Sequence, residues 1–171
     1  VVGQDDSYDF GSGAGFYVDA TEAPWRSHYK MYSYITKELL HLVESQGRLS
    51  GLKKSIMGHS MGGHGALVAF LRNPNLFTSV SAFAPICQPS AVPWGQKAFT
   101  GYLGHDKDEW KKYDATCLMS SILNKSAELV PILIDQGAED NFLVGKVDQL
   151  KPLAFKSACQ ACEYPIQLNL R

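Results

Sequence analysis

The sequence has little of what would place it in several large classes of protein. Its four cysteines are too few for a disulfide-stabilised scaffold in a chain of 171 residues, and they favour a reducing compartment. No apolar run approaches the length that spans a bilayer, so we expect no membrane-spanning helix. An excess of positive charge is also missing. Because 16 Lys and Arg face 17 Asp and Glu, the formal charge is -1 and gives no basic field for binding nucleic acid.

The length and composition are those of one globular domain. The chain is 45% hydrophobic and 19% charged, and a chain of this size can bury about 70% of the surface that it exposes when unfolded. No internal repeat, low-complexity tract or domain boundary is visible. We therefore expect residues 1–171 to belong to a single domain.

Helical and strand patterns alternate along the chain. Two helical patterns cover 62–71 and 146–162, the second with Pro152 in its first turn. An earlier amphipathic helix that stops at Gly47 is predicted by apolar residues at helical spacing, namely Met31, Ile35, Leu39 and Leu42. Short apolar runs predict strands at 55–59, 80–84, 131–136 and 166–170. Strands separated by helices indicate βαβ units, and hence an α/β fold with a mostly parallel sheet.

The stretch Gly58-His59-Ser60-Met61-Gly62 matches G-x-S-x-G, which indicates a nucleophile when a strand precedes it and a helix follows. Both conditions are predicted here. The glycines allow a sharp turn that holds Ser60 exposed at the N-terminus of the helix, where the Met61 N–H points to the place in which an oxyanion forms. The pattern therefore favours Ser60 as a nucleophile over a structural serine in a helix cap.

A serine nucleophile needs a base, and in this architecture the chain order is Ser, then Asp or Glu, then His. The strand at 131–136 and its following loop offer Asp135, Glu139 and Asp140 as the acid. We expect Glu139 to be a solvated loop charge. All five histidines precede Asp140, so none occupies the expected place of the base.

The histidines each have a simpler expected role than general base. His59 adjoins Ser60, but its side chain should point away from the serine and towards the interior of the sheet. His64 lies one turn along the helix and should be packed and hydrogen-bonded. The other three are expected at the surface or at the edge of the core; they are His28, His41 and His105. We therefore expect the base in a segment outside these residues.

Four stretches are more specific than G-x-S-x-G. They are GHSMGGHG at 58–65, DFGSGAGFYVDAT at 9–21, SAFAPIC at 81–87 and LIDQG at 133–137. Together they resemble the S-formylglutathione hydrolase family, also called esterase D, of the α/β-hydrolase superfamily. In this resemblance Ser60 matches the nucleophile, Asp140 matches the triad acid by its place after Asp-Gln-Gly-x-x, and Met61 supplies one oxyanion amide.

The resemblance implies an α/β-hydrolase fold, a mostly parallel sheet with helices on both faces. It implies hydrolysis of S-formylglutathione, a small-molecule thioester, to formate and glutathione in cytoplasmic formaldehyde detoxification. Activity on simple carboxylesters, no cofactor and a homodimer are implied as well.

The chain also departs from the family pattern. The family's N-terminal strands lie upstream of Val1, and its catalytic histidine follows the strand at 166–170. We therefore expect residues 1–171 to be a partial copy of the domain, poorly folded and inactive when expressed alone, because strands would be left unpaired at one edge of the sheet.

Two segments are candidates for the substrate pocket. The glycine-rich loop, with Phe10 and Gly11, is typical of ordered backbone that approaches something closely. In the aromatic segment 93–113, Trp94 is a candidate for lining the acyl pocket and Lys97 for meeting a glutathione carboxylate. The alternative is a helical insertion that packs on the core, which we favour for its last aromatics, Trp110 and Tyr113.

The motif Cys159-Gln160-Ala161-Cys162 is a weaker signal. It comes late in a helical pattern, unlike a thioredoxin-type redox pair, and no nearby ligand pair completes a zinc site. We expect packed thiols and no metal.

Two other functions compete with the esterase. An acyltransferase on the same scaffold would pass the acyl group to an alcohol or sugar, and a non-catalytic α/β-hydrolase-like protein would only bind its ligand. The absence of a base after Asp140 favours the second.

Overall fold

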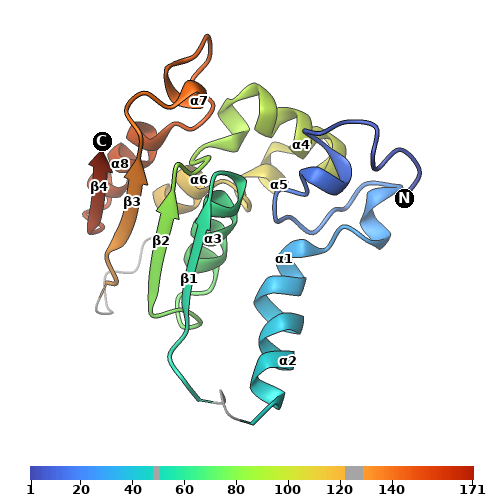
Figure 1. The fold of residues 1–171 in the computed structure, drawn as a ribbon, viewed down its shortest axis with the longest axis horizontal. Helices are drawn as coiled ribbons and strands as arrows, with labels where there is room; N and C mark the ends of the chain where they lie inside the picture. The colour runs from blue at the N-terminus through green and yellow to red at the C-terminus, as the bar shows by residue number, and fades with distance from the viewer. Residues whose placement is uncertain (48–50, 122–128) are drawn as a thin grey trace.

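The computed structural model describes residues 1–47, 51–121 and 129–171. Its centre is a four-stranded parallel sheet in the order β1-β2-β3-β4 (Figure 1). The strands are β1 Ser55–His59, β2 Ser79–Phe83, β3 Ile132–Gln136 and β4 Ile166–Leu170. All four predicted strands are therefore confirmed to within one residue at each end, and the parallel sheet with them.

Two of the predicted helices are present. The helix α3 extends over Met61–Arg72 and packs on β1 and β2. The helix α8, Pro152–Ala161, begins with Pro152 in its first turn as expected, but it does not include residues 146–151. There the Asp148 carboxylate accepts hydrogen bonds from the backbone of Leu150 and Lys151, at 2.9 and 2.8 Å, and this turn replaces the first helical residues. A separate short helix, α7, covers Asn141–Val144.

The predicted helix from Met31 ends before Gly47, which has a φ of +77°. It consists of α1 Met31–Ser33, a π-helical segment η3 Tyr34–Glu38, and α2 Leu39–Ser45. The apolar face predicted for it is wrong at both ends, because Met31 is 42% exposed and Leu42 is 56% exposed. The wider π-helical turn shifts the face that a 3.6-residue period would select. The buried positions are Tyr32 and Thr36 instead.

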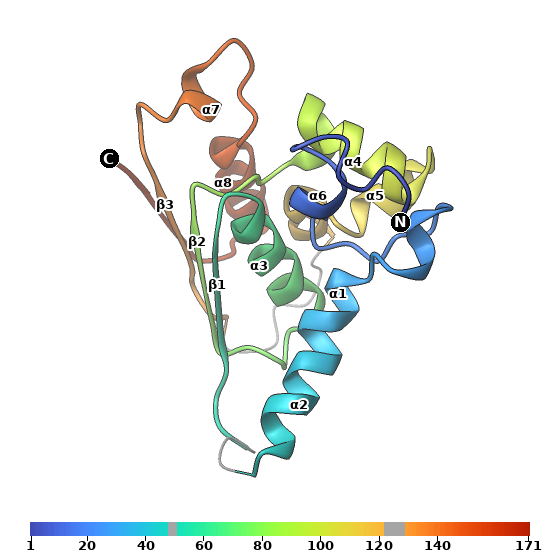
Figure 2. The same cartoon turned by 45° about the vertical axis from the view of Figure 1, so that its right-hand side comes forward.

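The helices of the described residues lie on one side of the sheet, with α7 over its carboxyl edge (Figure 2). The expectation of helices on both faces is thus met on one face only. On the covered side, the core includes Leu67, Phe70, Val80, Ile134 and Phe155. On the other side β1 presents Met57, which is 71% exposed. Both β1 and β4 have one strand neighbour each within the described residues.

The remaining helices lie between β2 and β3 in the chain. They are η4 Pro89–Ala91, α4 Pro93–Leu103, α5 Lys107–Lys111 and α6 Ala115–Ser120, and two short 3₁₀ turns, η1 Gly11–Gly13 and η2 Trp25–Ser27, precede them. Trp110 and Tyr113 are buried in the aromatic cluster beside α4, as predicted.

The thiols and the helix lengths bear on two sequence predictions. Cys159 is fully buried, and the partly buried Cys162 donates a hydrogen bond to the Ala158 carbonyl at 3.0 Å, so both are packed thiols as expected. In the part of the chain that the structure describes, no helix combines the length and apolar character needed to cross a bilayer.

Candidate active site

Ser60 lies on a strained turn between β1 and α3. Its backbone has φ 54° and ψ −118°, a conformation that a residue with a side chain adopts only at an energetic cost. Two glycines permit the turn. A Cβ at Gly58 would lie 2.1 Å from the Gly62 carbonyl oxygen, and one at Gly63 would lie 2.9 Å from the Pro85 Cβ. The Ser60 N–H donates to the Phe83 carbonyl at 2.8 Å, which fixes the turn to β2.

This turn prepares the Ser60 hydroxyl for nucleophilic chemistry. Ser60 is the N-cap of α3, yet its hydroxyl makes no capping hydrogen bond and remains free. The helix has 12 residues, and its first amides, beginning with Met61, have no helical carbonyl four residues earlier to which they can donate. Together with the helix dipole, these free N–H groups favour negative charge next to Ser60. The arrangement suits stabilisation of an oxyanion next to Ser60.

A cleft of about 780 Å³ opens in front of Ser60. The turn contributes Ser60 and Met61 to its lining, and Trp94 enters from α4. The N-terminal loop contributes three residues that were not predicted to line the pocket, Tyr8, Gly13 and Tyr17. Their only signal in the sequence is the unusual combination of aromatic residues with alternating glycines between residues 8 and 17.

Asp140 lies at the same edge of the sheet as Ser60. It is the N-cap of α7, and its carboxylate accepts from the Phe142 N–H at 2.8 Å and from the Gln136 amide at 3.4 Å. Because β1, β2 and β3 are parallel, Ser60 and Asp140 follow strands that are about 10 Å apart.

The other two acidic candidates lie in different surroundings. Asp135 forms an ion pair with Arg171, with 2.8 Å between Oδ1 and Nε. Glu139 is exposed, in agreement with its expected role as a solvated loop charge.

No histidine of the described residues hydrogen-bonds Ser60 or Asp140. The interior position predicted for His59 is wrong: its side chain is exposed and lines the cleft, because no described helix covers that face of the sheet. His64 is fully buried, and its Nε2–H donates to the Phe16 carbonyl at 3.0 Å, as its packed role required. Burial lowers the pKa of His64 to about 4. The three remaining histidines are exposed: His28, His41 and His105.

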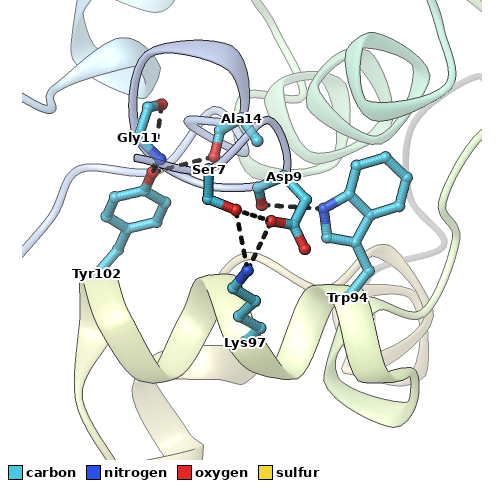
Figure 3. A network of polar contacts seen from close by, with 7 residues as sticks. All are labelled: Ser7, Asp9, Gly11, Ala14, Trp94, Lys97 and Tyr102. Atoms are coloured by element: carbon cyan, nitrogen blue, oxygen red, sulfur yellow. Dashed lines mark hydrogen bonds and ion pairs between the residues drawn. The ribbon is translucent and has the colours of Figure 1, made fainter. Parts of the chain in front are cut away.

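The helix α4, which carries Trp94, is connected to the N-terminal loop by a network of polar contacts (Figure 3). The Trp94 indole N–H donates to the Asp9 carbonyl at 3.1 Å. The Asp9 carboxylate in turn binds the Lys97 ammonium at 2.5 Å and the Ser7 hydroxyl. The hydrogen bond from Lys97 lowers the pKa of Asp9. Trp94 therefore lines the cleft in a fixed orientation, whereas Lys97 already has a carboxylate partner.

Phe10 and Gly11 occupy the core side of the loop. Phe10 stacks on Tyr102 with ring centroids 4.4 Å apart, and Gly11, at φ +74°, donates its N–H to the Tyr102 hydroxyl at 2.7 Å. The same hydroxyl donates to the Ala14 carbonyl at 3.0 Å (Figure 3). Burial raises the pKa of Tyr102 to about 12. Phe10, Gly11 and Lys97 are thus absent from the described lining of the cleft at Ser60, and of the four predicted pocket residues only Trp94 is brought there.

The described residues contain no group of three or more His, Cys, Asp or Glu that could hold a metal ion.

Comparisons with known proteins match the chain to esterases. The Esterase family model, "Putative esterase", matches residues 1–171. The S-formylglutathione hydrolases of Rattus norvegicus and Mus musculus are each 52% identical over all 171 residues. The chain spans 59% of the length of each of these curated relatives.

Solved structures show the same arrangement of elements. An S-formylglutathione hydrolase from Agrobacterium tumefaciens matches with a TM-score of 0.86 and 44% identity, over 96% of this chain and 57% of that one. Mycobacterium tuberculosis MPT51 matches with a TM-score of 0.73 over 94% of this chain and 66% of that one, at only 14% identity, so it shows likeness of fold alone. The sheet and its helices are those of an α/β-hydrolase fold, present in part.

Proposed function

The chain belongs to the esterase family, and from this premise we propose that it carries the nucleophile of a serine thioesterase that hydrolyses S-formylglutathione to formate and glutathione. The observation that carries the proposal is the strained turn at Ser60, which presents a free hydroxyl to a cleft at a helix N-terminus. The 52% identity to S-formylglutathione hydrolases supports the choice of substrate.

The reaction proceeds in two acyl-transfer steps. Ser60 Oγ attacks the formyl carbonyl as a base removes its proton, and the Met61 N–H stabilises the resulting oxyanion. The carbon–sulfur bond then breaks, and glutathione leaves as the thiol with the proton that the base returns. Water attacks the formyl-Ser60 ester in the same way, which releases formate and restores the hydroxyl.

Asp140 is proposed to orient the base, a histidine outside residues 1–171. Asp140 is held by the Gln136 amide and the Phe142 N–H, and it follows β3 at the edge where Ser60 follows β1. The five histidines of this chain have other surroundings, as described above. This assignment predicts that the first histidine after β4 in the full-length protein is essential for activity.

Trp94 is proposed to form the wall of the acyl pocket, because it is the aromatic residue of α4 in the lining at Ser60. Lys97 is proposed to bind a glutathione carboxylate, which would have to displace the Asp9 carboxylate from the Lys97 ammonium group. Four free thiols support a cytoplasmic location. A homodimer is proposed by family likeness and is tested by light scattering.

The test uses the protein that carries this chain at its natural full length. A fluorophosphonate probe is expected to form one adduct, at Ser60, and the Ser60→Ala variant is expected to lose the adduct and thioester hydrolysis. Asp140→Asn should keep the fold and lose about 10³–10⁴-fold in kcat. Formate released in equal amount to glutathione supports the hydrolase, and transfer of the formyl group to another acceptor supports an acyltransferase. No adduct, with Ser60→Ala equal to wild type, would leave a ligand-binding protein.

A further inference from the structure

Tyr17 occupies an unusual stretch of backbone beside the cleft. Phe16 and Tyr17 both adopt left-handed conformations, with φ of 52° and 49°. Two consecutive non-glycine residues rarely adopt this region, because Cβ crowds the carbonyl oxygen. Backbone of this kind persists only where the surrounding structure enforces it, and it is concentrated at functional sites.

The helix that begins at Ser60 enforces the position of Tyr17. The buried His64 donates from Nε2 to the Phe16 carbonyl at 3.0 Å, which fixes the left-handed pair to α3. The Tyr17 ring lies against Gly65, where an added Cβ would come within 2.5 Å of the ring Cγ. At Gly62, an added Cβ would have the Tyr17 hydroxyl oxygen as its near neighbour, at 3.8 Å. Gly62 and Gly65 of α3, which have no side chains, therefore leave the space that the Tyr17 side chain occupies.

Packed in this way, the Tyr17 side chain keeps its hydroxyl available to bind a substrate. Tyr17 lines the cleft together with Ser60, Met61 and Trp94. In the described part of the chain its hydroxyl has no hydrogen-bond partner. The described lining contains no Lys or Arg, and its side chains with hydrogen-bond donors are Tyr8, Tyr17, Ser55, His59, Ser60 and Trp94. From Ser60 the cleft continues along β1 past Met57 to Ser55, so it leaves room for more of a substrate than the reacting carbonyl.

We propose that Tyr17 determines specificity for the thiol half of the substrate, by donating a hydrogen bond from its hydroxyl to an amide or carboxylate oxygen of the glutathionyl group. Its hydroxyl lies next to Gly62, one residue beyond the Met61 amide that serves the oxyanion. From there the hydroxyl can reach substrate atoms that adjoin the reacting carbonyl on the thiol side. The inference rests on the proposed function and deepens it.

The experiment compares two substrates in the full-length protein. The Tyr17→Phe variant keeps the ring on Gly65 and removes only the hydroxyl. We expect it to raise KM for S-formylglutathione about 10-fold or more, with kcat nearly unchanged, since a hydrogen bond to a charged or strongly polar group is lost. KM for p-nitrophenyl acetate, which has no peptide half, should stay within about twofold of wild type.

The controls separate this role from a structural one. Tyr34→Phe alters an exposed tyrosine of η3 that is not in the lining at Ser60, and it should change neither KM. Gly65→Ala displaces the Tyr17 ring and should reproduce the selective rise in KM while Ser60 is still labelled by fluorophosphonate. Thermal unfolding midpoints of all variants show whether each is folded.

Each result decides between the proposals. A selective rise in KM for the glutathione thioester supports the role of Tyr17. An unchanged KM, or an equal loss with both substrates, overturns it while leaving the thioesterase intact. If wild type is neither labelled at Ser60 nor active, the proposed function fails, and this inference fails with it.

Discussion

At the scale of single residues, His64 links burial to the pH dependence of stability. Its pKa in the folded protein is about 4, against an ordinary value of 6.5, because burial disfavours the charged imidazolium. Between these two values the unfolded chain holds a proton on His64 and the folded chain does not. The unfolded state therefore binds more protons, and stability falls as the pH drops from about 6.5 to about 4. The whole window corresponds to about 3 kcal/mol.

The His64→Gln variant should remove this pH dependence. A glutamine amide can donate to the Phe16 carbonyl from a similar position but cannot titrate. We expect the free energy of unfolding of the variant, relative to wild type, to rise by about 2–3 kcal/mol when the pH is lowered from 7 to 4.5. Guanidinium unfolding at the two pH values measures this. His41→Gln, at an exposed site, serves as the control, and a slope equal to wild type in the His64→Gln protein would contradict the argument.

At the scale of elements, the turn between β1 and α3 depends on Gly58 having no side chain. A Cβ there would come within 2.1 Å of the Gly62 carbonyl oxygen, which is backbone and cannot rotate away. We expect Gly58→Ala to lower the free energy of unfolding by about 3 kcal/mol or more and to abolish labelling of Ser60. Chemical denaturation and the fluorophosphonate adduct measure the two effects.

Gly15 provides the matched control for that substitution. It lies in the N-terminal loop, its φ is not positive, and an added Cβ would meet nothing within 4 Å. Gly15→Ala should therefore change stability by less than about 1 kcal/mol. Equal effects of the two substitutions would show that the close approach at Gly58 is relaxed at little cost.

The strands were predictable from the sequence because their signal is local. Each is a short run with apolar residues on the helix-covered face, and three of them have a proline at or next to one end, Pro85, Pro131 and Pro165. The start of α8 and the buried face of α1–α2 were not predictable in the same way. The first depends on hydrogen bonds to the Asp148 carboxylate, and the second on a π-helical turn, and neither leaves a periodic pattern.

At the scale of the whole molecule, the candidate site combines parts of different predictability. Ser60 was predicted from a motif and Asp140 from a family resemblance, and both stay predictions; in the structure both follow parallel strands at one edge of the sheet. Tyr17 could not be predicted, because its position depends on a hydrogen bond from His64 and on packing against Gly65, 48 residues further along the chain. The roles of Phe10 and Lys97 depend likewise on distant partners, Tyr102 and Asp9.

One face of the sheet has no described helix over it. Met57 is 71% exposed on β1, and no described helix covers this face (Figure 2). Apolar side chains on an open sheet with an unpaired edge favour association. A polypeptide of these 171 residues alone should therefore bind the dye ANS, unfold over a broad temperature range and lack esterase activity. Met57→Lys should reduce ANS binding, whereas Val144→Lys, at an exposed position on α7, should not. A sharp, cooperative transition without ANS binding would show that the sheet is stable with this face in water.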